Sequence, residues 1–171
     1  MKETLKNNKT TLTLLLGAIA ALYAGTYMTY YKTGLKATYF KGKAFKTPLL
    51  STIDKSIAFD TGGSFHNGLP HNHFSVLWEG FLQIKTSGKY TFISHNDDGF
   101  KLRIDKNVLI NDWHAHAVNE NRVTLSLEKG LHPIEVRYFD HIGNAVAKLS
   151  WITPYYTHEK PIPTQSFSYE E

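Results

Sequence analysis

The stretch Lys89–Asp105, KYTFISHNDDGFKLRID, holds two short runs in which apolar and polar residues alternate. Tyr90 and Phe92 share one side of the first run, and Phe100–Asp105 alternates in the same way. Because successive side chains of a strand point to opposite faces, a period of two is typical of strands with one buried face. The Asp-Asp-Gly triplet at 97–99 lies between the runs and favours a turn. The stretch therefore predicts two antiparallel strands joined at 97–99.

The same alternation recurs along the chain without any long helical period after Leu35. The further runs are Ser75–Leu82, Val108–Ile110, Arg122–Leu127, Pro133–Phe139 and Ala145–Trp151. Turn signals rich in Gly, Asn and Asp separate them. Seven or more short strands at this spacing predict an all-β domain, an antiparallel two-sheet β-sandwich. Tyr155–Glu171, with two prolines and little alternation, predicts an extended edge or tail whose last residues are free or partner-bound.

Composition and motifs exclude several classes of protein. The chain of 171 residues has no cysteine, which excludes a disulfide scaffold and Cys-ligated zinc. Residues 1–46 hold eight lysines and one glutamate, whereas 47–171 hold eleven basic and fourteen acidic residues. The domain is thus mildly acidic and lacks the basic face that nucleic-acid binding needs. Nucleophile and phosphate-loop motifs are missing, and Glu79 and Glu135 are single acids on different strands, so we expect no enzyme.

The amino-terminal segment predicts one transmembrane α-helix. Leu12–Tyr31 has twenty residues without a charge, enough for ~30 Å of helix, the thickness of a bilayer's hydrocarbon core. Lysines flank the segment on both sides, and tyrosines gather at its far end, where amphipathic rings prefer the headgroup level. We therefore divide the chain into a basic tail at 1–10, a transmembrane helix or signal anchor at 11–32, and the sandwich with its tail at 33–171.

Small side chains form a ridge on one face of that helix. They recur every four residues, at Thr13, Gly17, Ala21, Gly25 and Thr29. Such ridges let two membrane helices approach closely, which favours a retained anchor packed against other membrane helices. A cleaved signal peptide, cut near Ala18-Ile19-Ala20, and hence a secreted soluble domain, is the alternative. The lysine count on the two sides does not set the orientation; the short basic start resembles a signal anchor that leaves the C-terminal domain in the periplasm or at the cell surface.

Seven motifs in order give the domain a family resemblance. They are Gly34–Phe40, Phe74–Phe81, Ser87–Phe92, Asn96–Leu102, Asn111–Trp113, Gly130–Tyr138 and Leu149–Trp151. Together they resemble the anthrax-protective-antigen-type domain, a β-sandwich module shared with yeast flocculin adhesins and glycosidase insertions. The resemblance covers about residues 34–167. It implies extracytoplasmic placement and, in several branches, glycan binding.

The adjacent carboxylates of Asp97 and Asp98 allow two interpretations. In the first, one of them bonds backbone amides of a turn in which Gly99 supplies a positive φ. In the second, a hard cation offsets their repulsion, since Ca²⁺ takes oxygen ligands. The resemblance favours the second: in the adhesin branch the matching pair holds calcium through a cis peptide, and a second loop and sugar hydroxyls complete the coordination.

That second loop aligns with Asp140–Asn144. The resemblance therefore implies Asp140 as a third acidic ligand, assisted by the carbonyls of Ile142 and Asn144, with Asn144 and His141 as sugar-contacting residues. Asp140 stands where the adhesin branch has Asn, which makes the site more negative, and the long adhesin insertions that grip the glycan are missing from this chain.

Histidines and tryptophans supply weaker candidates. His71-x-His73 and His114-x-His116 each place two imidazoles on one strand face, where His66 or His141 could join them around Zn²⁺ or Cu²⁺. No third ligand follows at a diagnostic spacing, so surface histidines are the simpler interpretation. Trp78, Trp113 and Trp151 lie within alternating or turn-adjacent motifs, which favours core packing over sugar stacking.

Two functions follow from these observations. The first is a membrane-anchored, extracytoplasmic, non-catalytic interaction or assembly module, an accessory subunit that packs its helix against other membrane helices. The second is a cell-surface, calcium-dependent carbohydrate-binding domain of the adhesin type, whose cation is held by Asp97, Asp98 and Asp140.

Overall fold

The computed structural model describes residues 31–61 and 65–170. The chain divides into two units, Met1–Lys32 with Glu170–Glu171 and Thr33–Tyr169, and the sandwich is the second of these. Most of the segment predicted to cross the membrane lies outside the described residues; its last two residues, Tyr31 and Lys32, lie in strand β1 (Tyr31–Thr33). No helix within the described ranges has the length and apolar character of a membrane span.

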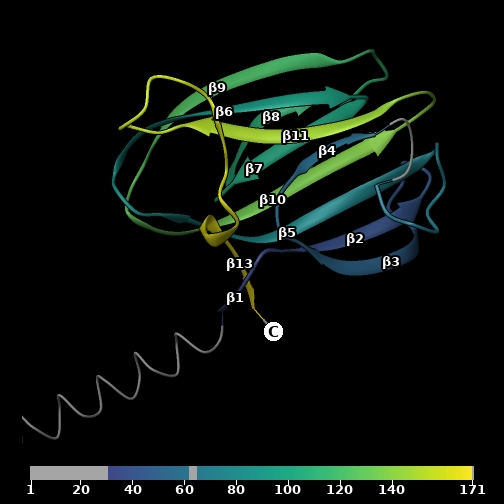
Figure 1. The fold of residues 1–171 in the computed structure, drawn as a ribbon, viewed down its shortest axis with the longest axis horizontal. Helices are drawn as coiled ribbons and strands as arrows, with labels where there is room; N and C mark the ends of the chain where they lie inside the picture. The colour runs from purple at the N-terminus through teal and green to yellow at the C-terminus, as the bar shows by residue number, and fades with distance from the viewer. Residues whose placement is uncertain (1–30, 62–64, 171) are drawn as a thin grey trace, which may run out of the picture. The chain divides into compact units, whose positions relative to one another are not determined.

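Two antiparallel sheets pack as layers (Figure 1). The eight-stranded sheet has the order β1, β13 (Phe167–Glu170), β5 (Phe74–Ile84), β10 (Gly130–Asp140), β7 (Gly99–Ile104) and β8 (Asn107–Asp112), and it also holds β2 (Leu35–Lys41) and β3 (Thr47–Asp54). The five-stranded sheet has the order β12 (Lys160–Pro161), β11 (Ala145–Ile152), β6 (Gly88–Asp97) and β9 (Asn119–Leu127), with β4 (Ala58–Thr61) beside β11. The predicted all-β two-sheet antiparallel sandwich is confirmed.

The core lies between the sheets and is built by the alternating residues. On β10, Ile134, Val136 and Tyr138 are buried, and Tyr90 and Phe92 are buried on β6, as their period of two predicts. Each such side chain contributes about 1.5–3 kcal/mol when it leaves water. The core prediction for the tryptophans is confirmed at two positions, Trp78 and Trp151, which are buried. Trp113 is half-buried, outside the main core.

One buried acid ties the core together. The Asp54 carboxylate is 5% exposed and accepts hydrogen bonds from the Tyr39 hydroxyl at 2.5 Å and from the Trp78 indole at 2.7 Å. His66 Nε2 lies 3.1 Å from the other carboxylate oxygen. Burial and the Asp54 charge raise the pKa of Tyr39, so its hydroxyl stays a donor at neutral pH. His66 thus belongs to this structural network rather than to either predicted histidine pair.

The Asp-Asp-Gly triplet is not a hairpin turn. It links β6 of the five-stranded sheet to β7 of the eight-stranded sheet, so the chain changes layers here. The Asp97–Asp98 peptide bond is cis, as the resemblance implied. The predicted positive φ at Gly99 is wrong: Gly99 is not among the positive-φ glycines of the described ranges. An added Cβ would lie 2.1 Å from Phe139 Cε1, so this position needs glycine because the Phe139 ring approaches closely.

The C-terminal segment is held rather than free. Ile162 is 3% exposed and Phe167 is 1% exposed, and β13 pairs with β5 through Phe167 and Leu82. A short 3-10 helix, Thr164–Ser166, precedes that strand. The predicted extended edge is therefore correct, and its apolar residues complete the core.

Candidate functional site

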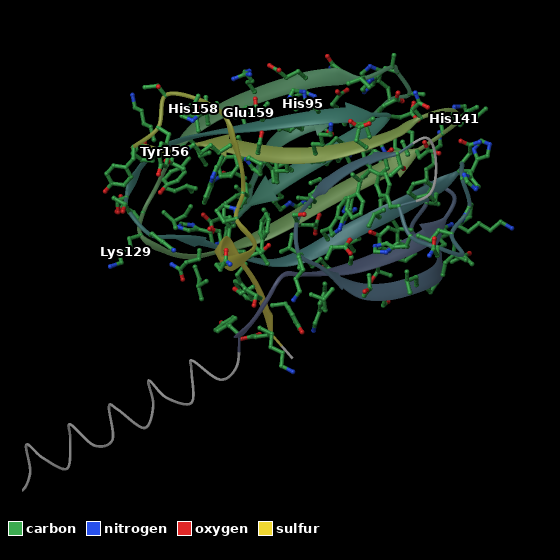
Figure 2. All side chains as sticks on the ribbon, viewed as in Figure 1. His95, Lys129, His141, Tyr156, His158 and Glu159 are labelled. Atoms are coloured by element: carbon green, nitrogen blue, oxygen red, sulfur yellow. The ribbon has the colours of Figure 1, made fainter. Side chains whose placement is uncertain are left out.

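Three acids meet where strands of both sheets end. Asp97 is the last residue of β6 and Asp140 the last of β10, and Phe139 pairs with Gly99 across β10 and β7. This register brings together two segments that lie more than forty residues apart in the chain. Asp98 is 4% exposed and Asp140 is 1% exposed, while Asp97 is half-buried. The loop that follows Asp140 lies at one end of the sandwich, and Lys129 and Tyr156 lie at the other (Figure 2).

Backbone amides fix two of these carboxylates. Asp98 Oδ1 accepts the His116 N–H at 3.0 Å, and its Oδ2 accepts the His141 N–H at 2.6 Å. Asp140 Oδ2 accepts the His73 N–H at 3.2 Å. Asp140 Oδ1 is buried and has no hydrogen-bond partner among the described residues. A buried acceptor left without a partner costs about 1–3 kcal/mol, so this oxygen needs an explanation.

The three acids repel one another. Burial, and then the charge of Asp98, raises the pKa of Asp140 to about 7, against the opposing effect of the hydrogen bond from His73. Burial and the charge of Asp98 also raise the pKa of Asp97, which His116 partly offsets. The Tyr138 hydroxyl donates to the main-chain oxygen of Asp97, and burial keeps it protonated by raising its pKa. A bound cation would remove this repulsion.

The residues present fit calcium. Carboxylate and carbonyl oxygens are the ligands that Ca²⁺ prefers, and Asp140 Oδ1 is an acceptor that no donor of residues 31–61 and 65–170 reaches. The oxygens of Asp97, Asp98 and Asp140 are not among the described groups of three ligand atoms that lie within 4.8 Å of one another. Three oxygens bound to one Ca²⁺ at ~2.3–2.6 Å generally fall within that distance, so calcium binding requires the three side chains to move toward one another.

The loop that was expected to complete the site is exposed. Ile142 is 64% exposed, and His141 and Asn144 are also exposed. The Gly143 N–H donates to Asn72 Oδ1 at 3.0 Å, which ties this loop to the segment before β5. The loop thus borders the acids and presents the predicted sugar-contacting side chains to solvent.

A carboxylate that the spacing argument did not include lies beside the second histidine pair. Asp112, the last residue of β8, lies with His114 and His116 so that one ligand atom from each falls within 4.8 Å of the others. Its burial would raise its pKa, but hydrogen bonds from Asn121, Asn119 and Asn96 outweigh burial and hold the pKa below its ordinary value. Asp112 precedes His114 by two residues, so the Asp-x-His-x-His spacing was the available signal. His71 and His73, the other pair, are both exposed.

Two acids expected to be isolated are neighbours. The register pairs Glu79 of β5 with Glu135 of β10, so their side chains share one face of the sheet. Glu79 is exposed, and Glu135 accepts a hydrogen bond from Arg137 Nε at 2.9 Å. One acid of the pair is therefore already neutralised by a guanidinium.

Comparison with known proteins identifies the family of the sandwich. The family model for the PA14 domain matches residues 31–165. The chain belongs to the PA14 domain family. The resemblance inferred from the seven motifs is thereby confirmed. Anti-sigma-I factor RsgI3 of Acetivibrio thermocellus is 32% identical over 121 residues, which are 70% of this chain and 19% of that protein. Protective antigen of Bacillus anthracis is 30% identical over 109 residues, 61% of this chain and 14% of that protein.

Two solved structures share the fold. An anti-sigma factor domain-containing protein from Clostridium clariflavum superposes with a TM-score of 0.75 at 29% identity, over 82% of this chain and 48% of that one. The PA14 sugar-binding domain from an RTX adhesin superposes with a TM-score of 0.63 at 15% identity, over 80% of this chain and 98% of that one. At 15% identity, the likeness to the RTX adhesin domain shows a shared fold alone. The chain spans less than a fifth of either curated relative, so the comparison reaches their PA14 parts only.

Proposed function

We propose that the PA14 sandwich is a non-catalytic, extracytoplasmic binding domain that recognises carbohydrate through a calcium ion held by Asp97, Asp98 and Asp140. The observation that carries the proposal is the buried Asp140 Oδ1, which has no hydrogen-bond partner in the described part of the chain and lies close to the charges of Asp98 and Asp97. Asp98 and Asp140 also accept backbone N–H groups, but those bonds leave Asp140 Oδ1 unused. The sugar-binding RTX adhesin domain and this chain share the fold, which supports carbohydrate as the ligand class.

Each part of the site has a separate task. The two amides that bond Asp98 hold its carboxylate in place before a ligand arrives, which lowers the ordering cost of binding. A bound calcium ion supplies positive charge and open coordination positions that neighbouring sugar hydroxyls can fill. His141 and Asn144 are exposed at the rim and can contact the rest of the sugar. Their loop sets which sugars fit.

Calorimetry tests the cation. The full chain, freed of metal with a chelator, is titrated with Ca²⁺ and applied to a glycan array with and without the chelator. We expect one saturable calcium site, chelator-sensitive glycan binding, and loss of both in Asp97→Asn combined with Asp140→Asn. Asp60→Asn, an exposed acid on β4, is the matched control and should bind as the wild type does. A chain that gives no heat with Ca²⁺ and no chelator-dependent glycan signal would refute the proposal.

A membrane anchor is the second part of the proposed function. The uncharged Leu12–Tyr31 segment supports it, and its ridge of small residues supports packing against other membrane helices. Gly17, Ala21 and Gly25 are replaced together by leucine, and co-purifying membrane proteins are compared after detergent extraction. We expect those partners to be lost. Thr26→Leu, a small-to-leucine change away from the ridge, should keep them, and partners that survive the triple change would argue against helix packing.

A further inference from the structure

We propose that Asp112, His114 and His116 form a binding site for Zn²⁺ that is separate from the calcium site. The three residues lie at the end of β8 and in the loop that leads from there to β9 of the other sheet. The site does not rest on the proposed carbohydrate function, because its side chains are different ones.

Each imidazole nitrogen lies near a different carboxylate oxygen of Asp112, and one ligand atom of each residue falls within 4.8 Å of the others. His114 Nδ1 lies 3.0 Å from Asp112 Oδ1, and His116 Nε2 lies 3.2 Å from Asp112 Oδ2. In a tetrahedral site with ligands at ~2.0–2.1 Å from the ion, neighbouring ligand atoms are ~3.3 Å apart. The two imidazole rings are adjacent, with centroids 4.7 Å apart. An ion could therefore enter with only small movements of side chains.

The His116 ring is held in the tautomer that a metal needs. Its Nδ1 lies 2.6 Å from the Ala117 carbonyl oxygen, and because a carbonyl only accepts, Nδ1 must carry the hydrogen. The Nε2 of a neutral ring then presents a lone pair, and it faces Asp112 Oδ2, which is also an acceptor. Asn96 Nδ2 lies 3.4 Å from Nε2 and 3.3 Å from Oδ2, and a proton or a metal ion shared by the two acceptors would join this amide in holding them together. Metal-bound histidines commonly donate their other ring N–H to a carbonyl in this way.

Amide side chains hold Asp112 from behind. Its carboxylate is buried, at 8% exposed, and its Oδ2 accepts hydrogen bonds from Asn121 Nδ2 at 2.9 Å and Asn119 Nδ2 at 3.1 Å. Asn96 Nδ2 lies 3.3 Å from the same oxygen. In metal sites, groups around the ligands hold a ligating carboxylate in one orientation by hydrogen bonds of this kind. The asparagines come from β6 and β9, so the site spans both sheets.

The ligand types select the metal. Two imidazole nitrogens and one carboxylate oxygen suit Zn²⁺, whereas Ca²⁺ needs six to eight oxygens. The His114 side chain is 69% exposed, which leaves an open path for the ion and room for water as a fourth ligand. The cluster of His95, Glu120 and Glu159 offers a contrast: Arg122 lies against both of its glutamates and already supplies the positive charge. His95 and Glu159 can be seen close together in Figure 2.

Titration of the metal-free full chain with Zn²⁺ tests the site, read by calorimetry and by competition with a zinc-binding dye. We expect one saturable site, with affinity lowered at least about 100-fold by His116→Ala and at least about 10-fold by His114→Ala. His158→Ala, an exposed histidine elsewhere, should leave the affinity unchanged. The exposed His114 side chain pairs with Asp112 rather than with a calcium-site acid, so the Ca²⁺ titration of His114→Ala should match the wild type.

Two results would overturn the zinc site. One is the absence of saturable Zn²⁺ binding, which would mean that a proton alone occupies the gap between His116 and Asp112. The other is equal affinity in the wild type and in both histidine variants. The exposed His114 side chain carries little of the fold, so His114→Ala keeps the test valid if His116→Ala unfolds. A wild-type chain that binds Zn²⁺ but not Ca²⁺ would refute the proposed function and still support the zinc site.

Discussion

Replacing Asp140 with Asn should stabilise the calcium-free domain and weaken its binding of calcium. The folded domain holds the Asp140 proton up to about pH 7, whereas an unfolded chain releases it near the ordinary 3.8. Between these values the folded state binds more protons, so the stability of the wild type falls as pH rises from about 4 to about 7. Asn has no such titration, and its amide can donate toward the neighbouring carboxylates.

The size of the stabilisation by Asp140→Asn follows from the same pKa. The rise from 3.8 to about 7 sets a ceiling of about 4 kcal/mol on the cost of ionising Asp140, at about 1.36 kcal/mol per pH unit. Solvent and salt screen part of this repulsion, so we expect about 2 kcal/mol of stabilisation above pH 7. For a domain of this size that corresponds to roughly 6–8 °C in Tm. At about pH 4 the two proteins should be equally stable, because Asp140 is then protonated in the folded state.

Thermal unfolding of wild type and variant across this pH range, in a calcium chelator, measures the effect. Adding Ca²⁺ should raise the Tm of the wild type and change that of the variant much less, since binding to the folded state alone stabilises it. Asp60→Asn should change the Tm little at any pH, because surface substitutions usually stay within about 0.5 kcal/mol. A variant less stable than the wild type above pH 7, or a wild type whose stability does not change with pH, would refute the reasoning.

Two further predictions concern the fold. Gly99→Ala should destabilise the domain by about 1–3 kcal/mol because its Cβ would meet the Phe139 ring at 2.1 Å. In urea unfolding, adding Phe139→Leu to this variant should recover part of the lost stability. A double mutant whose loss equals the sum of the two single losses would contradict this cause. Asp54→Ala should cost about 3–5 kcal/mol, because it leaves the Tyr39 hydroxyl and the Trp78 indole buried without an acceptor; a thermal scan with an unchanged Tm would be inconsistent with that network.

The strands that alternate were predictable, and those that do not alternate were not. Pro133–Phe139 and Lys89–Ser94 lie within β10 and β6, because half-buried strands show their period of two directly. Thr47–Asp54 was missed as a strand, since β2 is its only partner among the described strands and most of its residues are partly or fully exposed. Where a strand packs against little, its sequence carries no burial pattern to read.

The candidate sites were predictable to different degrees. Asp97 and Asp98 were singled out by their adjacency, and the family resemblance pointed to Asp140. That Asp140 Oδ1 lacks a hydrogen-bond partner among the residues the structure describes depends on what surrounds it in three dimensions. For the zinc site, Asp112 was within reach of a spacing argument. The asparagines that orient it, Asn96 and Asn121, come from two other strands and could not be found in that way.

The alternating strands, the two-sheet class and the family could be predicted from the chain alone, because a period of two and an ordered series of motifs are properties of the sequence. Tertiary structure decided which strands are partners. Alternation tells which face of a strand is buried, but not against which sheet. The triplet at 97–99 looked like a hairpin turn between neighbouring strands, and instead it carries the chain from one sheet to the other. That crossing brings Asp98 to Asp140, and the packing of the Phe139 ring on Gly99 holds them there.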